Sequence, residues 1–141
     1  MLPSIYFHSE DTHYTIKHKK AIKQWMNTSI ENENHTCGEI NIILCSDEHL
    51  HKMNVEHLNH DTYTDIITFD YTENNLVSGD LFISIDRVRE NAKTHKTALT
   101  NELNRVIIHG TLHLLGYKDK SPEHQLEMTS KEDFYLSLRK F

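Results

Sequence analysis

Apolar side chains recur every three to four residues along the stretch from Leu99 to Leu115, near the end of the chain. This is the period at which an α-helix returns to the same face. Further apolar residues cover much of the remaining helix surface, and a helix that is apolar nearly all round is buried. We therefore expect a central helix within the core. Its main apolar stripe consists of Leu103, Val106, Ile107, Gly110 and Leu114.

Shorter patterns predict the other elements of the fold. Apolar, mostly β-branched runs are typical of strands, and they lie at residues 5–7, 38–44, 64–69 and 79–85. Helical spacing or a serine cap predicts further helices at residues 17–30, 46–58, 86–96 and 121–138. This set of elements indicates a single α+β domain over residues 1–141. We expect a mixed sheet of about four strands with four or five helices.

The composition is that of a globular protein with a sizeable core. Of 141 residues, 37% are hydrophobic and 26% are charged. No run of about eighteen apolar residues occurs, so we expect no membrane-spanning helix. The first residues also lack the basic and then apolar pattern of a secretory signal. We therefore expect a cytoplasmic protein in which Cys37 and Cys45 are reduced thiols, with a disulfide between them as the less favoured alternative.

The charge balance is acidic, with a formal net charge of −6. It argues mildly against a nucleic-acid partner, because polyanion binding usually rests on Lys and Arg. Four lysines near the start of the first helix form either a solvated face or a phosphate-contacting patch. Most of the 12 histidines are scattered singly, and we expect five of them on the surface. They are His8, His13, His18, His35 and His95.

Two further histidines stand four residues apart on the central helix, at His109 and His113. Residues at this spacing share a helix face, so both imidazoles can reach one point in space. Gly116 can end the helix in a left-handed conformation, which lets the chain fold back and bring Asp119 to the same point. Three protein ligands with an open position are typical of catalytic zinc. We expect one Zn²⁺ per chain on His109, His113 and Asp119, with His124 as the alternative third ligand.

The spacing is close to the zinc-peptidase motif His-Glu-x2-His-x2-Gly-x2-His. Gly110 replaces the glutamate that serves as general base in those peptidases, which argues against peptide hydrolysis. We expect this glycine to leave room beside the metal. Asp119 replaces the third histidine, and a carboxylate is an acceptable zinc ligand. Glu102 shares the helical strip of the histidines, so it is a candidate hydrogen-bond partner for one of them or a candidate general base.

Three stretches resemble the YbeY family, the metal-dependent endoribonucleases of bacterial ribosomal RNA maturation. Residues 109–117, His-Gly-Thr-Leu-His-Leu-Leu-Gly-Tyr, are similar to the family signature. The stretch from Asn54 to Phe69 resembles the family segment Asn-x9-Thr-Asp/Asn-Val-Leu-Ser-Phe, and Ser78 to Ser84 resembles its Gly-Asp-Ile strand. The order and spacing of the three stretches agree with the family as well.

The resemblance implies zinc on His109, His113 and the third-ligand position. It implies cleavage of single-stranded RNA, processing of the 3′ end of the small-subunit ribosomal RNA and a role in ribosome quality control. RNA and the ribosome are the implied partners. The resemblance also implies a substrate groove lined by Thr64, Asp65, Gly79 and Asp80.

Two positions depart from the family pattern. The family has Asp-His after the tyrosine of its signature, where this chain has Lys118 and Asp119. It also has an arginine, thought to handle the phosphate, where this chain has Leu58. Candidate replacements for the arginine are Lys118, Lys120, Arg87 and Arg89. Two alternatives to the endoribonuclease are a zinc-binding ribosome-assembly factor without catalysis and, less favoured, a metallopeptidase-like hydrolase.

Overall fold

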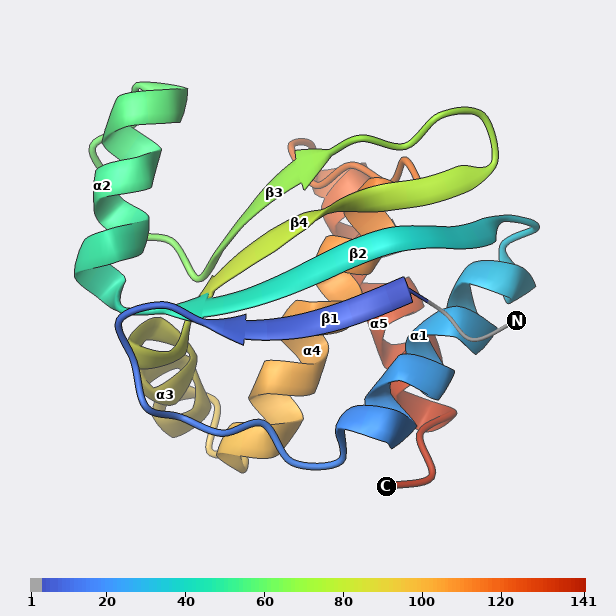
Figure 1. Ribbon diagram of the computed structural model, residues 1–141, viewed down its shortest axis with the longest axis horizontal. Helices are drawn as coiled ribbons and strands as arrows, with labels where there is room; N and C mark the ends of the chain where they lie inside the picture. The colour runs from blue at the N-terminus through green and yellow to red at the C-terminus, as the bar shows by residue number, and fades with distance from the viewer. Residues whose placement is uncertain (1–3) are drawn as a thin grey trace.

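The computed structural model describes residues 4–141, and these form four strands and five helices (Figure 1). The strands are β1 (Ser4–Ser9), β2 (Thr36–Cys45), β3 (Ile66–Asp70) and β4 (Leu76–Ser84). The helices are α1 (Lys19–Asn32), α2 (Asp47–Leu58), α3 (Ile85–Thr94), α4 (Leu99–Leu114) and α5 (Pro122–Ser137). The predicted α+β class and the predicted number of elements are confirmed.

The four strands form one mixed sheet in the order β1-β2-β4-β3. Strands β1, β2 and β4 run parallel to one another, whereas β3 runs antiparallel to β4. Strand β3 therefore lies at an edge of the sheet, directly beside β4. Helices α1, α4 and α5 lie on one face of the sheet, and α2 lies against one end of the other face (Figure 1).

The main core lies between the sheet and α4, as the apolar pattern of this helix predicts. Ile107, Ile108 and Leu112 are 0% exposed, and they pack with the inward side chains of β2 and β4. A smaller cluster of Cys45, Leu50 and Ile67 lies under α2 on the other face. The central helix is thus packed on several sides, and this packing also restrains the residues at its C-terminal end.

Helix α4 approaches the sheet closely at Gly110. A Cβ atom at this position would lie 2.7 Å from Ile66 Cδ1 and 2.9 Å from Leu81 Cδ2. The glycine therefore faces the sheet, and the space that it leaves is filled by the side chains of β3 and β4. The expectation that Gly110 leaves room beside the metal is wrong, because the helix turns this position toward the core.

The ends of several helices and strands differ from the predicted ones, because local backbone conformation and capping hydrogen bonds determine them. Helix α1 begins after His18, which adopts a left-handed conformation with φ 61°. Strand β4 ends one residue earlier than predicted, because Ser84 caps α3 by accepting a hydrogen bond from the Arg87 backbone N–H. Strand β3 begins only at Ile66, so the residues before it lie in the loop that follows α2. Within the described part of the chain, no helix combines the length and apolar character needed to cross a membrane.

Both cysteines are free thiols, as predicted. Cys37 is half-buried and Cys45 is buried. Burial raises the pKa of Cys37 to about 11 and that of Cys45 to about 12, so both stay protonated at neutral pH. Of the five histidines expected on the surface, His35 is half-buried and the other four are exposed.

Candidate metal centre

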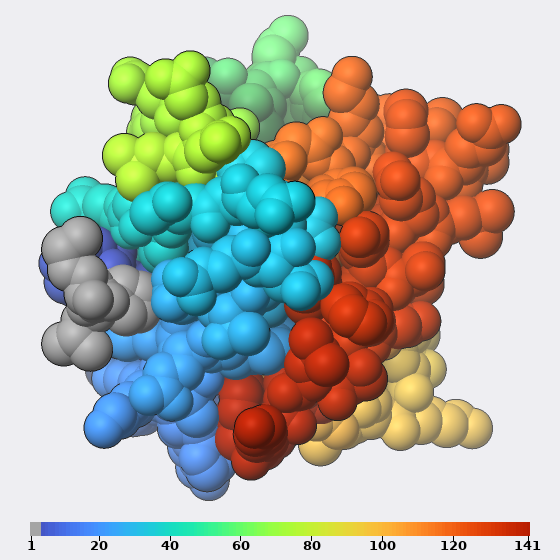
Figure 2. All heavy atoms as spheres, turned by 90° about the vertical axis from the view of Figure 1, so that its right-hand side faces the viewer, coloured from blue at the N-terminus to red at the C-terminus, as the bar shows by residue number. Residues whose placement is uncertain are grey.

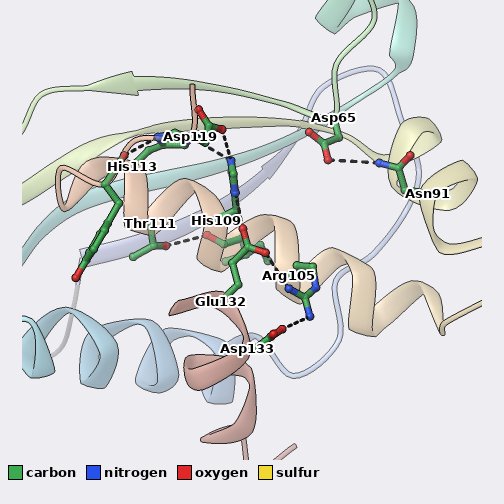
Figure 3. A network of polar contacts seen from close by, with 11 residues as sticks. Asp65, Asn91, Arg105, His109, Thr111, His113, Asp119, Glu132 and Asp133 are labelled. Atoms are coloured by element: carbon green, nitrogen blue, oxygen red, sulfur yellow. Dashed lines mark hydrogen bonds and ion pairs between the residues drawn. The ribbon is translucent and has the colours of Figure 1, made fainter. Parts of the chain in front are cut away.

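Three side chains meet at the C-terminal end of α4 (Figure 3). His109 and His113 project from its last turns, and Gly116 then adopts φ 101°, which turns the chain back toward them. His109 Nε2 lies 3.0 Å from His113 Nε2, and each of these atoms lies 3.2 Å from Asp119 Oδ2. The structure therefore brings together the two helical histidines and the carboxylate that follows the turn.

The hydrogen bonds of the two imidazoles show where their protons lie. His113 Nδ1 is 3.0 Å from the carbonyl oxygen of Tyr117, which can only accept, so Nδ1 carries the proton. His109 Nδ1 lies 2.6 Å from a carboxylate oxygen of Glu132 and donates to it in the same way. In the neutral rings both Nε2 atoms consequently present lone pairs toward Asp119 Oδ2.

This arrangement fits a tetrahedral metal ion. Three acceptor atoms that face one another without a proton between them repel, and a cation removes that repulsion. Ligands about 2.0–2.1 Å from a tetrahedral zinc ion lie about 3.3 Å apart, close to the separations found here. The hydrogen bonds at both Nδ1 atoms are those that orient histidine ligands in metalloproteins. The residues present therefore fit a divalent cation with two imidazole ligands and one carboxylate ligand.

The charges around His109 and its burial act on its pKa in opposite directions. Burial alone disfavours the imidazolium, but the hydrogen bond to Glu132 and the nearby carboxylates of Asp119 and Asp65 outweigh it and raise the pKa of His109. The site therefore favours positive charge at this position, whether on the ring or on an ion that the ring binds.

An open groove of about 510 Å³ begins at these three residues. It runs between the C-terminal end of α2, the edge strand β3 and the loop after α4. Thr64, Asp65 and Lys120 line the groove, as expected. Thr68 also lines it, and its Oγ1 is a buried atom that lacks a hydrogen-bond partner within residues 4–141. Such an atom is available to a bound ligand.

Three other residues expected in the groove lie elsewhere. Gly79 packs against α4, where a Cβ atom would lie 2.6 Å from Leu114 Cδ2. Asp80 points to the other face of the sheet and accepts a hydrogen bond of 3.1 Å from Asn41 Nδ2. Lys118 lines a separate cavity of about 320 Å³ together with His124. Strand alternation and helix packing turn Gly79 and Asp80 away from this groove. The course of the loop after α4 places Lys118 outside it as well.

His124 stays apart from the two helical histidines. It lies in the first turn of α5, where its backbone N–H donates to Ser121 Oγ at 3.1 Å, and it is exposed. The predicted cap at Ser121 and the following proline thus carry His124 into the next helix. The geometry favours Asp119 over His124 as the third ligand.

Asp65 is the groove carboxylate with the strongest response to burial. Burial raises its pKa, although the charge of His109 acts in the opposite direction. Its Oδ2 accepts a hydrogen bond of 3.4 Å from Asn91 Nδ2 on α3 (Figure 3). A carboxylate with a raised pKa beside a candidate metal site is suited to accept and return a proton.

Glu102 contacts a different histidine from the one expected. Its Oε1 lies 3.2 Å from Nδ1 of the exposed His95, and it does not line the groove. Glu132 on α5 contacts His109 instead, a contact that was not predicted from the sequence. A signal was available, because Glu132 stands on the buried stripe of α5 between Met128 and Tyr135. A carboxylate on such a stripe needs a charged or hydrogen-bonding partner.

A family model described as "Endoribonuclease YbeY" matches residues 4–139. The chain belongs to the YbeY family. Curated relatives named "Endoribonuclease YbeY" include one from Cytophaga hutchinsonii, which is 49% identical over 98% of this chain and 97% of its own length. Another, from Flavobacterium johnsoniae, is 50% identical over 91% of this chain and 92% of its own. A Thermotoga maritima protein solved in solution superposes with a TM-score of 0.66 at 27% identity, covering 94% of this chain and 87% of that one.

The departure from the YbeY pattern at Leu58 lies within the groove. Leu58 is 45% exposed and lines it, at the C-terminal end of α2. Among the residues described, Lys120 is the one lysine or arginine in the groove lining. Arg87 is bound to Asp47 at 2.6 Å, and Arg89 lies 3.7 Å from Asp86. Of the four candidate replacements for the YbeY arginine, Lys120 alone is therefore placed to reach a ligand in the groove.

Proposed function

We propose that this protein is a zinc-dependent endoribonuclease that cuts single-stranded RNA. The observation that carries the proposal is the convergence of His109 Nε2, His113 Nε2 and Asp119 Oδ2 at the mouth of an open groove. The printed names of the curated relatives supply the reaction class, because they describe endoribonucleases. Endonuclease activity on RNA is thus the function that the site and the family support together.

We propose zinc as the ion, one per chain. Two imidazoles and one carboxylate, with a fourth position open, form the ligand set of catalytic zinc sites. When bound, such an ion polarises a phosphate oxygen or lowers the pKa of a water molecule. His109 and His113 serve this chemistry by holding their Nδ1 protons away from the ligand positions.

Lys120 and Asp65 take the two remaining roles in the proposed reaction. The Lys120 ammonium offsets the charge that builds up on the phosphate during cleavage. The Asp65 carboxylate accepts the proton of the attacking hydroxyl or water, which its raised pKa suits. Thr68 Oγ1 offers a further hydrogen bond to an RNA strand bound in the groove. The groove has the volume of a small-ligand pocket, which suits an unpaired nucleotide better than a stacked duplex.

The biological setting of the proposal comes from the resemblance. We propose that the enzyme acts in the cytoplasm on ribosomal RNA, at the 3′ end of the small-subunit RNA, and in ribosome quality control. The ribosome is then its macromolecular partner. The position that carries the general base in zinc peptidases is Gly110, which faces the sheet, so no residue at that place supports a peptidase.

The experiment compares three substrates with protein purified without a polyhistidine tag. These are a single-stranded RNA, the same sequence in a duplex, and an unstructured polypeptide. We expect one zinc per chain by metal analysis, cleavage of the single strand alone, and loss of cleavage after chelation. A zinc-loaded protein that binds ribosomes but cuts no RNA would be the assembly factor instead. Product ends identify the attacking group, because a 2′,3′-cyclic phosphate excludes direct attack by water.

The role of Lys120 has a matched control two residues earlier. Lys120→Ala should lower kcat/KM by about tenfold, the usual effect of losing one charge-assisted contact. Lys118→Ala removes the same charge from the same loop but from a different cavity, so its kcat/KM should stay within about twofold of the parent. Equal effects of the two substitutions would show that Lys120 acts only through the general charge of the loop.

A further inference from the structure

Each metal-binding histidine is held by a carboxylate that lies outside the proposed ligand set. Glu132 reaches His109 directly, and Glu33 reaches His113 through Tyr117. Both carboxylates are largely buried, with side-chain exposures of 8% and 12%. A buried carboxylate needs partners that compensate for the loss of water. The partners found here connect the metal site to α1 and α5, two helices that carry none of the three ligands.

Glu132 is fixed at both of its oxygen atoms. Oε2 accepts the hydrogen bond from His109 Nδ1 at 2.6 Å, and Oε1 accepts one from Arg105 Nη1 at 2.8 Å. Arg105 in turn donates to Asp133 at 2.7 Å through its other terminal nitrogen (Figure 3). Since neither oxygen is free to turn, the carboxylate fixes both the orientation of the His109 ring and the nitrogen that carries its proton.

Glu33 acts at one remove, through a residue that is held at both ends. The Tyr117 hydroxyl donates to Glu33 Oε1 at 2.6 Å, and the Tyr117 carbonyl oxygen accepts from His113 Nδ1 at 3.0 Å. Lys131 and the Tyr135 hydroxyl, both from α5, contact the second oxygen of Glu33. Figure 2 shows the end of α1 beside α5 and the loop after α4, where these contacts lie.

We propose that Glu132 and the Glu33–Tyr117 pair are positioning residues that set the metal affinity of the site. The inference rests on the proposed metal centre and extends it to α5, which supplies Glu132 and two partners of Glu33. Glu132 has the larger effect, because it contacts a ligand directly and determines its tautomer. Tyr117 has the smaller effect, because its carbonyl belongs to the backbone and remains when the hydroxyl is removed.

The test measures zinc affinity in competition with a chromophoric chelator, without any assay of cleavage. Glu132→Gln should weaken zinc binding by about 10- to 100-fold, the range found when the hydrogen-bond partner of a histidine ligand is removed. Tyr117→Phe should weaken it by about three- to tenfold. The matched control is Asp133→Asn, which alters the neighbouring carboxylate on the same arginine, and it should stay within about threefold of the parent.

A second readout separates positioning from general stability. At mildly alkaline pH, nitrogen-15 spectra of the metal-free parent should show His109 protonated at Nδ1. In Glu132→Gln a population protonated at Nε2 should appear, because the amide group can also donate toward the ring. A change in thermal stability alone would not move this proton.

The outcomes separate this inference from the proposed function. The parent protein is measured before any variant. If it binds no zinc, both the proposed function and this inference are overturned. A parent that binds zinc, with Glu132→Gln binding as tightly and showing the same tautomer, overturns the inference and leaves the proposed function intact. If Glu132→Gln does not fold, Tyr117→Phe decides, since an affinity equal to that of the parent would overturn the inference as well.

Discussion

The metal centre and the groove beside it differ in how firmly their side chains are held. His109 and His113 are 22% and 26% exposed, and each is oriented by a hydrogen bond at Nδ1. Lys120 is exposed in the groove, and it forms no ion pair with the residues that the structure describes. A metal ion requires ligands placed within fractions of an ångström. A flexible RNA strand, by contrast, can be bound by charged side chains that are mobile. The comparison indicates that rigidity is concentrated on the metal side.

Removing one of the three proposed ligands should have the largest effect. His113→Ala should abolish tight zinc binding and lower cleavage by about 10³-fold or more, because the ion supplies several kcal/mol of charge stabilisation. Metal analysis and a single-turnover assay measure the two effects. The fold should survive, since His113 lies at the end of α4 and is partly exposed. A folded His113→Ala variant that still cleaves RNA at the parent rate would contradict the proposed site.

Asp65→Asn tests the proposed proton acceptor on the groove side. We expect kcat to fall by about 10²-fold, the usual contribution of a general base. Zinc affinity should remain near that of the parent, because Asp65 is not a ligand. The parent rate should increase with pH as the Asp65 carboxyl ionises, and the increase should disappear in the variant. An unchanged pH profile would assign the proton transfer to another group.

The same substitution should raise stability. Burial raises the pKa of Asp65 in the folded protein, so its contribution to stability is complete at acidic pH, below the unfolded value. That contribution is lost as the pH rises through the raised folded value. At neutral pH, Asp65→Asn should therefore increase the free energy of unfolding in denaturant titrations. At pH values well below the unfolded pKa the two proteins should be equally stable, and a difference that persists there would assign the effect to something other than the charge.

Leu58→Arg would add to the groove a positive charge that is anchored on α2. The residue stands at the end of α2 and faces the groove, so an arginine there should reach a bound phosphate. We expect kcat/KM for single-stranded RNA to rise by about tenfold, as for one added charge-assisted hydrogen bond. Leu58→Gln, which introduces a polar side chain without the charge, should change it by less than about twofold. A similar gain in both variants would indicate polarity rather than charge.

Salt dependence gives the smallest and most graded of these effects. With Lys120 as the one lysine or arginine lining the groove among described residues, log(kcat/KM) should fall with log of the salt concentration at a slope of about −0.7. Leu58→Arg should steepen the slope to about −1.4, and Lys120→Ala should bring it close to zero. A steep slope in the parent would show that Lys or Arg side chains outside the groove also bind the RNA strand.

The parts of the site that were predictable are those set by local geometry. The spacing of His109 and His113 on one helix, and the turn at Gly116 that returns Asp119, follow from helix periodicity and backbone conformation. The cap at Ser121 that carries His124 away is local in the same sense. The central position of α4 follows from its apolar pattern.

The features of the site that were not predicted depend on contacts between segments that are distant in the sequence. Glu102 and Glu132 are both buried carboxylates, and only the packing of α5 on α4 decides that Glu132 reaches His109. Gly79 and Asp80 alternate across β4, but the sequence does not state which face of the sheet borders the groove. The resemblance supplied the family, whereas the orientation of each side chain required the fold.

The close contact at Gly110 has a consequence for the dimensions of the site. Ile66, which the glycine meets, directly follows Asp65, and Gly110 directly follows His109. The spacing between the proposed proton acceptor and the first proposed ligand is therefore set by an apolar contact in the interior. Any side chain added at Gly110 would push β3 outward and widen that spacing without touching a polar atom.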